Sequence, residues 1–281
     1  MPAHHSAICI RALIKLLTLP LLILATPVAR AADSVPGGIY LHPLGEGVNA
    51  VEYLGHPVML YNRVAVVGIG LSASPGTHRI RIHYDDGREE TRQFEVREKQ
   101  YTEQRLTIDN PRMVNPDPQD LARIRSESAS MRERYQRFGE LTDSPLPFIQ
   151  PVAGPLSSSF GRRRILNGEP RAPHSGLDIA VNTGTPIQSP AAGTITLTGN
   201  FYFNGNTVFV DHGAGLISML CHLSRIDVEE GQKVGRGGIL GLVGATGRVT
   251  GPHLHWSVSM NGNRVDPVQV MALFSESPVD P

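Results

Sequence analysis

Cysteine is nearly absent from this chain of 281 residues. Only Cys9 and Cys221 occur, and Cys9 lies in an N-terminal segment that we expect to be removed. The one remaining thiol excludes an internal disulfide in the mature chain. The fold must therefore be held together by its apolar core.

Long apolar runs are missing as well. The clearest run covers residues 16–26, follows the basic residues Arg11 and Lys15, and precedes a small-residue segment at 29–31. This arrangement is typical of a secretory signal peptide. The apolar run itself is too short to span a bilayer. We expect residues 1–31 to be removed on export to the periplasm, with the extracellular space as the alternative, and we expect no stable membrane insertion.

The chain also lacks an excess of positive charge. It contains 26 basic and 26 acidic residues, and the predicted signal peptide holds three of the basic ones and none of the acidic ones. The mature protein would carry a net charge of about −3 with histidine neutral, which gives no nucleic-acid signal. Its glycine-rich turns lack the strand-to-helix setting of a phosphate loop, so we expect no nucleotide cofactor.

Short β patterns separated by turns make up most of what is present. Residues 32–106 are predicted to form a small β-sandwich-like module. Its clearest part is the alternating run at 78–84, which the turn at 85–87 joins to a second alternating run through Phe94 and Val96. Such a pattern predicts a β-hairpin.

Residues 107–148 are predicted to be a linker that contains a helix. Asp117 is a plausible N-cap, Pro118 suits the first helical position, and Gly139 is the expected stop. The apolar stripe that we expect on this helix comprises Leu121, Ile124, Met131, Tyr135 and Phe138.

From residue 149 onward, glycine pairs and triples separate short β segments. This pattern predicts an antiparallel sheet over residues 149–271, with a tail at 272–281. Helical periodicity returns only at residues 267–274. The chain as a whole is therefore predicted to be mainly β.

Two short motifs carry the strongest chemical signal. His174 and Asp178 are four residues apart, and His253 and His255 are two apart. Side chains at such spacings share one face of a strand, so both pairs can point into one cleft. A catalytic zinc uses three nitrogen or oxygen ligands and keeps one position open, whereas a structural zinc is usually closed by cysteines. The motifs therefore predict a zinc hydrolase, although the helical His-Glu-x-x-His motif is absent.

The order of the motifs resembles that of the lysostaphin-type (LytM-like) zinc metallo-endopeptidases. The resemblance covers roughly residues 149–268, and five motifs recur in order, which makes it far more specific than an isolated His-x-His pair. The motifs are Ser159-Phe160-Gly161-Arg162-Arg163, His174-Ser175-Gly176-Leu177-Asp178-Ile179-Ala180, Gly184-Thr185-Pro186-Ile187, Cys221-His222-Leu223-Ser224 and Thr246-Gly247-Arg248-Val249-Thr250-Gly251-Pro252-His253-Leu254-His255.

The resemblance implies a role for each matching residue. It makes His174, Asp178 and His255 the ligands of Zn²⁺, and His222 and His253 the catalytic pair. It implies an antiparallel sheet with an open groove and the peptide cross-links of bacterial peptidoglycan as substrate. It leaves open which of the two catalytic histidines is the base, which bond is cut and which wall-hydrolase partners exist. It also leaves open whether residues 33–148 inhibit the enzyme, recruit a partner or align the substrate.

Several other interpretations compete with these. Relatives that have lost their ligands act as regulators of other wall hydrolases, and a zinc peptidase acting on proteins is a second alternative. A tyrosine is common in the family where Leu220 stands here. Consecutive strand residues face opposite ways, so we expect Cys221 to point away from His222 and to be a small buried residue.

Two further groups of basic side chains have less specific signals. His212 lies in a predicted turn without a partner, and the turn interpretation outweighs ligation. The arginines at 162–164 could contact a carboxylate of a wall peptide, and a solvated loop is an equal alternative.

Overall fold

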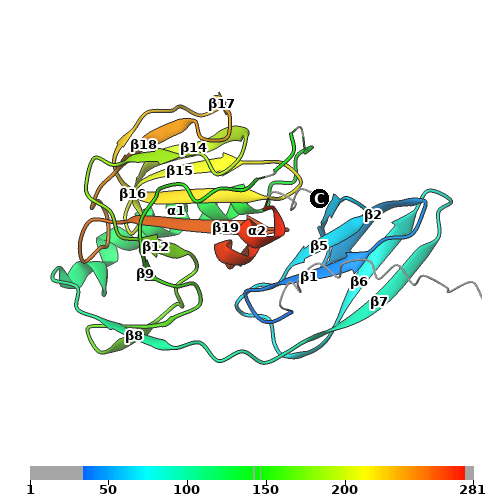
Figure 1. The fold of residues 1–281 in the computed structure, drawn as a ribbon. Helices are drawn as coiled ribbons and strands as arrows, with labels where there is room; N and C mark the ends of the chain where they lie inside the picture. The colour runs from blue at the N-terminus through cyan, green and yellow to red at the C-terminus, as the bar shows by residue number, and fades with distance from the viewer. Residues whose placement is uncertain (1–33, 142, 146, 276–281) are drawn as a thin grey trace, which may run out of the picture. The chain divides into compact units, whose positions relative to one another are not determined.

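The computed structural model describes residues 34–141, 143–145 and 147–275 (Figure 1). The predicted signal peptide, two positions of the linker and residues 276–281 of the predicted tail lie outside this range. Within it, the chain forms twenty strands, two α-helices and one 3₁₀ turn, η1 (Pro111–Met113). The fold is mainly β, as predicted.

The N-terminal part is a pair of antiparallel sheets packed face to face. Val51, Ile80 and Phe94 of one sheet meet Ala65 and Val67 of the other in a single apolar core, which confirms the predicted sandwich. The first sheet has the order β3-β2-β6-β7 and the second β1-β5-β4. The strands are β1 (Ile39–Pro43), β2 (Val48–Tyr53), β3 (His56–Pro57), β4 (Met59–Tyr61), β5 (Val64–Gly68), β6 (Gly76–Tyr84) and β7 (Glu89–Val96).

Helix α1 (Pro118–Tyr135) begins where the sequence predicts. Asp117 is extended at the N-cap position, but its carboxylate forms no cap hydrogen bond and instead pairs with Arg112 at 2.9 Å. The predicted stripe is only partly buried, since the side chain of Leu121 is 38% exposed. No described helix has the length and apolar character that a membrane crossing requires.

The end of α1 differs from the prediction, which extended the helix to Phe138. The chain leaves the helix after Tyr135 because the following residues bond to a turn of the large sheet. Arg137 pairs with Asp211 at 3.2 Å, and the Ala214 amide donates to the Gly139 carbonyl at 2.7 Å. Tyr135 itself packs edge-on against Phe209, with ring centroids 5.1 Å apart.

The C-terminal part is built on a ten-stranded antiparallel sheet with the central order β17-β14-β15-β16-β19-β12-β9. Strands β13, β18 and β20 extend it, and helix α2 (Pro267–Leu273) packs on β19. The strands are β9 (Leu156–Ser158), β12 (Leu177–Ile179), β13 (Pro186–Gln188), β14 (Gly193–Phe201), β15 (Gly205–Asp211), β16 (Ile217–Ile226), β17 (Lys233–Val234), β18 (Ile239–Val243), β19 (Leu254–Met260) and β20 (Asn263–Val265).

A third, small sheet joins the two parts of the sequence. Strand β8 (Glu103–Leu106), from the N-terminal half, pairs in parallel with β10 (Arg163–Leu166), which also pairs with β11 (Glu169–Arg171). A second link is reciprocal, since the Asn261 side chain accepts from the Gly68 amide at 2.6 Å and donates to its carbonyl at 3.0 Å. Ile39, Met59 and Val66 also belong to the core of the large sheet. The domain boundaries given above stay predictions.

Candidate active site

The three side chains assigned as ligands meet at the centre of the large sheet. Asp178 on β12 lies directly opposite His255 on β19, and His174 precedes β12. Asp178 Oδ1 is 2.7 Å from His255 Nδ1 and 2.9 Å from His174 Nε2, and these two nitrogens are 3.1 Å apart. All three residues are buried. The i and i+4 spacing and the strand alternation thus bring together the residues that the sequence singled out.

The outer nitrogens of the two histidines define which atoms face the centre. His174 Nδ1 lies 2.9 Å from the Ser159 carbonyl, and because a carbonyl oxygen only accepts, this nitrogen carries the proton. His255 Nε2 donates to Ser257 Oγ at 3.0 Å, and that hydroxyl donates to the Ser175 carbonyl at 2.8 Å. Hydrogen bonds of this kind orient metal-binding histidines.

The inner atoms therefore form a site that can hold a cation. Two imidazole lone pairs and a carboxylate oxygen converge within 3.1 Å of one another with no proton assigned between them. Ligand atoms that share a tetrahedral metal lie on the order of 3.3 Å apart. Two nitrogens and one oxygen, each held by a second partner, fit a divalent metal with one open position.

Electrostatics favour the metal-binding protonation states of Asp178 and His255. Burial raises the pKa of Asp178, but the neighbouring His174 and His255 nitrogens outweigh it and keep that pKa far below its usual range. Burial lowers the pKa of His255 to about 4, against the opposing effect of Asp178. The carboxylate is therefore ionised and the imidazole of His255 neutral near pH 7, as metal ligation requires.

The loop before β12 is fixed by a close approach of two backbones. A Cβ at Gly176 would lie 2.5 Å from the Trp256 carbonyl oxygen, so only glycine lets this loop pass over β19. The His174 amide donates to the Arg162 carbonyl at 2.8 Å, and the Gly161 amide donates to the His174 carbonyl at 2.7 Å. These contacts explain the glycine between His174 and Asp178 and the Phe-Gly-Arg segment that precedes them.

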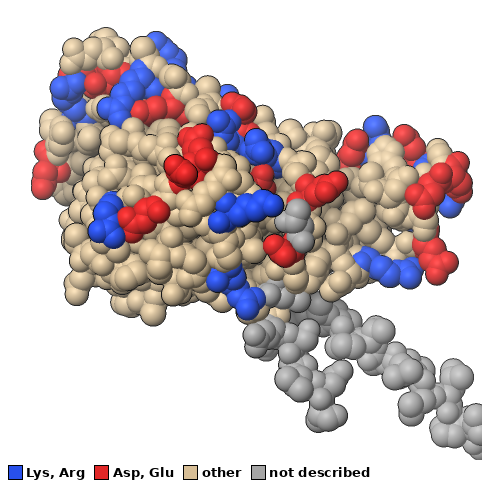
Figure 2. All heavy atoms as spheres, turned by 90° about the horizontal axis from the view of Figure 1, so that it is seen from above, with Lys and Arg blue, Asp and Glu red and all other residues tan. Residues whose placement is uncertain are grey.

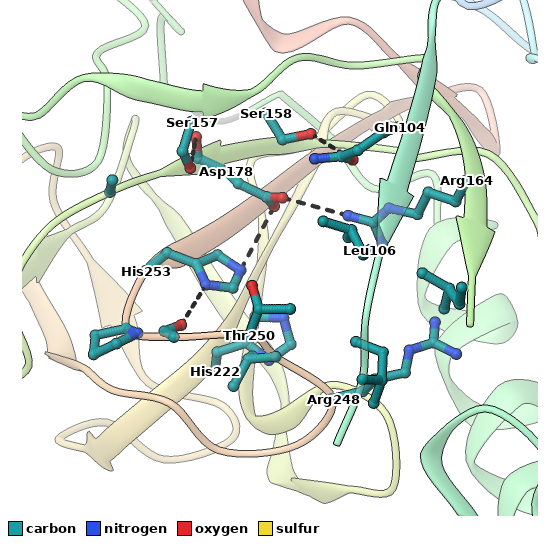
Figure 3. A pocket seen from close by; sticks show the side chains of 16 residues that line it. Gln104, Leu106, Ser157, Ser158, Arg164, Asp178, His222, Arg248, Thr250 and His253 are labelled. Atoms are coloured by element: carbon teal, nitrogen blue, oxygen red, sulfur yellow. Dashed lines mark hydrogen bonds and ion pairs between the residues drawn. The ribbon is translucent and has the colours of Figure 1, made fainter. Parts of the chain in front are cut away.

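His222 and His253 lie beside the triad and are held in the same way. His222 Nδ1 donates to the Thr246 carbonyl and His253 Nδ1 to the Gly251 carbonyl, both at 2.8 Å. Each Nε2 is thereby left as a lone pair. The rings are 4.9 Å apart, and His253 Nε2 is 3.8 Å from Asp178 Oδ1. In Figure 3, His253 and Arg164 approach Asp178 from different sides.

A kink in β16 turns His222 toward the site. Its φ of +67° is left-handed, and the strand leaves β19 after Cys221 to pair with β18 from Leu223 onward. Burial, followed by the charges of His255 and His253, lowers the pKa of His222 to about 3. The ring is therefore neutral near pH 7, as a proton acceptor must be.

The same kink corrects the prediction for the orientation of Cys221. Cys221 lies directly opposite His255, and cross-strand partners share a face of the sheet. It therefore shares the face that carries the ligands instead of pointing away. Its sulfur accepts from the Asn204 amide at 3.2 Å and packs with Met219, and burial raises the pKa of the thiol to about 12. The residue is buried, as expected, and its raised pKa disfavours the thiolate that a nucleophile requires.

Leu220 and His212 both lie outside the cluster of ligands, although His212 has partners that the sequence did not indicate. Leu220 is fully buried in the core of the sheet, so no side chain at this position reaches the site. His212 is also buried and lies outside the triad, where it bonds to the Ala192 carbonyl and to Ser218 Oγ, each at 2.9 Å. It takes no part in the cluster of ligands.

Sequence reasoning missed the residues that form the far wall of the groove. Gln104, Leu106 and Ile108, from the segment around β8, line a cavity of about 320 Å³ together with His253 and Arg248. The first three residues of β8 are all polar, so alternation does not mark it as a strand. Its parallel pairing with β10 was not predictable either, because it joins residues about sixty positions apart.

Comparison with known proteins places this site in a family. The profile of Peptidase family M23 matches residues 172–267. A crystal structure of a peptidase M23 from Pseudomonas aeruginosa is 45% identical, with a TM-score of 0.71, and the match covers 86% of this chain and 96% of the other. The chain belongs to peptidase family M23.

Curated relatives match this M23 chain over a shorter length. Peptidoglycan DD-endopeptidase ShyA of Vibrio cholerae is 44% identical over 112 residues, which are 40% of this chain and 26% of the relative. The DD-carboxypeptidase/endopeptidase Mpg of Neisseria meningitidis is 41% identical over 135 residues, which are 48% of this chain and 30% of the relative. The chain thus spans less than a third of these relatives.

The matched M23 region and the site overlap only in part. Residues 172–267 include the three side chains assigned as ligands and the two histidines that the resemblance makes the catalytic pair, together with the Thr246 and Gly251 carbonyls that orient those two histidines. They do not include Arg164 or the wall formed by Gln104 and Leu106. The M23 region therefore supplies the reactive groups, and the preceding residues complete the groove.

Proposed function

We propose that this chain is a zinc endopeptidase that hydrolyses peptide cross-links of peptidoglycan. The observation that carries the proposal is the pair of bare Nε2 atoms of His222 and His253 beside three converging ligand lone pairs. The activities for which the V. cholerae and N. meningitidis relatives are named support this substrate class. The signal-peptide pattern at residues 1–31 supports action in the periplasm.

The residues divide the chemistry among them. A zinc ion held by His174, Asp178 and His255 would lower the pKa of a bound water toward 7 and polarise the peptide carbonyl. One of the two neighbouring histidines accepts the proton of the attacking water at Nε2. The other, once protonated, stabilises the tetrahedral oxyanion or donates to the leaving amine. The Thr246 and Gly251 carbonyls keep both Nε2 atoms aimed at the reacting groups.

Two other functions remain as competing hypotheses. A regulator without activity needs neither ligands nor catalytic histidines, whereas this chain keeps all five residues in a bonded arrangement. A zinc peptidase that acts on proteins would use the same groups. Digestion of a protein such as casein beside wall material separates the two substrate classes.

The decisive experiment is digestion of purified wall sacculi by the mature, zinc-loaded protein, with the fragments identified by mass spectrometry. His222→Ala and His253→Ala should retain zinc and lose about a hundredfold or more in rate, as expected for general acid or base groups. His56→Ala, on exposed strand β3, is the matched control and should match the parent protein. Near-normal turnover of either active-site variant would exclude the proposed pair.

A further inference from the structure

A second cavity, of about 440 Å³, lies next to the ligands and is lined by arginine without any acid. Its wall contains no aspartate or glutamate among the described residues. On the molecular face in Figure 2, by contrast, acidic and basic side chains lie next to one another. The four arginines of the cavity are Arg164, Arg171, Arg248 and Arg264.

Only one of these arginines is well balanced by the protein. Arg171 pairs with Glu169 at 2.7 Å and donates to the Val114 carbonyl. Arg164 lies 3.3 Å from Asp178 Oδ2, but the other oxygen of that carboxylate already contacts the two histidines of the triad. The Nε of Arg164 is buried and has no partner among the described residues.

The other two arginines have no carboxylate partner within the described part of the chain. Arg248 donates to the Met113 carbonyl at 3.3 Å and lies over the Phe203 ring at 4.5 Å. Burial, reinforced by Arg164 and Arg171, lowers its pKa to about 10, so the group still carries its charge at neutral pH. Arg264 lies 5.7 Å from the centre of the Tyr135 ring. Partly buried positive charge of this kind is costly unless an anion joins it.

The cavity continues directly into the catalytic groove. Arg164, Arg248 and His222 line both this cavity and the one that contains His253 and Asp178. The arginine-lined space is therefore open to a peptide whose scissile bond lies at the histidines. Carboxylates are the anions that an unmodified peptide carries at neutral pH, and planar guanidinium groups bind them in a bidentate way.

We propose that this cavity, which we term the arginine subsite, binds a free carboxylate on the substrate residue next to the cleaved bond. The inference rests on the proposed peptidase function and adds a specificity to it. Arg164 and Arg248 bind the carboxylate, while Arg171 braces the Val114 backbone. Ser128 and Met131 of α1 also line the cavity.

The test compares two synthetic cross-linked peptides that differ at one group. One carries a free carboxylate beside the scissile amide, and in the other that carboxylate is amidated. The parent protein should cleave the acid form with a kcat/KM roughly tenfold to a hundredfold higher, through KM, as expected for charge-assisted hydrogen bonds. Arg248→Gln should lose this preference, and Arg248→Lys should recover part of it. Arg79→Gln, on exposed β6, is the control and should keep the full preference.

The failures of the two proposals are distinguishable. Equal cleavage of both peptides by the parent protein, or an unchanged preference in Arg248→Gln, overturns the arginine subsite and leaves the peptidase intact. Cleavage of neither peptide overturns the peptidase, and calorimetric titration of the acid and amidated peptides then tests the subsite by binding alone. Circular dichroism melts of each variant confirm that a lost preference does not reflect unfolding.

Discussion

The two faces of the large sheet differ in what they contribute, and β19 shows this within seven residues. Leu254, Trp256 and Val258 point into the apolar core, whereas His255 and Ser257 point to the opposite face. All of β19 is buried. Burial of apolar side chains stabilises the first face directly, whereas the second face has to supply hydrogen-bond partners for its polar groups. On β19, the active site therefore belongs to the face whose buried polar groups must find hydrogen-bond partners.

The polar face is also the one that other segments have to cover. Tyr135 of α1 packs on it, and Gln104 and Leu106 form a wall of the adjoining groove. Both come from residues that precede the M23 match. The apolar face is completed by α2 and by parts of the N-terminal sandwich such as Ile39 and Met59. The N-terminal half thus contributes to the active-site face through α1 and β8, and to the apolar core through the sandwich.

The strongest way to break this comparison is to substitute one residue on each face of β19. His255→Ala removes a ligand from a site that has only three, so zinc and activity should both be lost, the activity by more than a hundredfold. Val258→Ala, on the other face, should cost about 2 kcal/mol of folding stability and keep its zinc. Metal analysis and thermal melts provide the readouts. Full zinc occupancy in His255→Ala would refute the ligand assignment.

A shortened chain that begins at Ser144 separates the contributions of the N-terminal half. It lacks β8, so β10 loses its parallel partner and the groove loses Gln104 and Leu106. We expect lower stability and at least tenfold lower activity on sacculi, with zinc binding retained because the ligands remain. A latent enzyme whose N-terminal half blocks the groove predicts the reverse, a faster shortened chain. Rates measured per zinc-loaded molecule decide between the two.

Local patterns predicted the parts of the site that depend on local geometry. Alternation along residues 254–260 and the spacing of His174 and Asp178 define faces of strands, and the structure brings the ligands together accordingly. The left-handed conformation of His222 was not predictable, because it arises where β16 exchanges one partner strand for another. The orientation of Cys221 was predicted wrongly for the same reason.

Long-range pairing accounts for most of what the sequence did not show. The position of β8 depends on β10, and the end of α1 depends on Arg137 meeting Asp211. Neither partner lies within reach of a periodicity argument. The arginine subsite is a further example, since Arg164 and Arg248 are 84 positions apart in the sequence and come together only in the folded chain.

A smaller effect on folding stability is expected at His212. This residue is a buried polar side chain outside the active site, so it shows what burial of such a group costs where no catalysis is involved. Burial lowers its pKa to about 4 from an ordinary value of 6.5, so the unfolded chain binds a proton that the native chain does not. Stability should therefore fall as the pH drops from about 6.5 to about 4, by about 3 kcal/mol from this group. His212→Gln removes the titration, and its stability relative to the parent should improve over that interval. Urea unfolding at several pH values measures it, and parallel curves would contradict the assignment.

The smallest effect is expected at Cys221, which shares the face of the ligands but has no hydrogen bond to their donor atoms within the described part of the chain. Its sulfur meets the Asn204 amide and Met219, so Cys221→Ser replaces a buried thiol by a more polar hydroxyl that can still accept the Asn204 hydrogen bond. We expect a loss of about 1–2 kcal/mol in unfolding free energy, with zinc content and turnover close to those of the parent. Cys221→Ala, which removes the acceptor and leaves the Asn204 amide without it, serves as the comparison variant. Complete inactivation of a folded, zinc-loaded Cys221→Ser protein would show that the thiol takes part in the chemistry, because the hydroxyl keeps the packing and the hydrogen bond and differs mainly in reactivity.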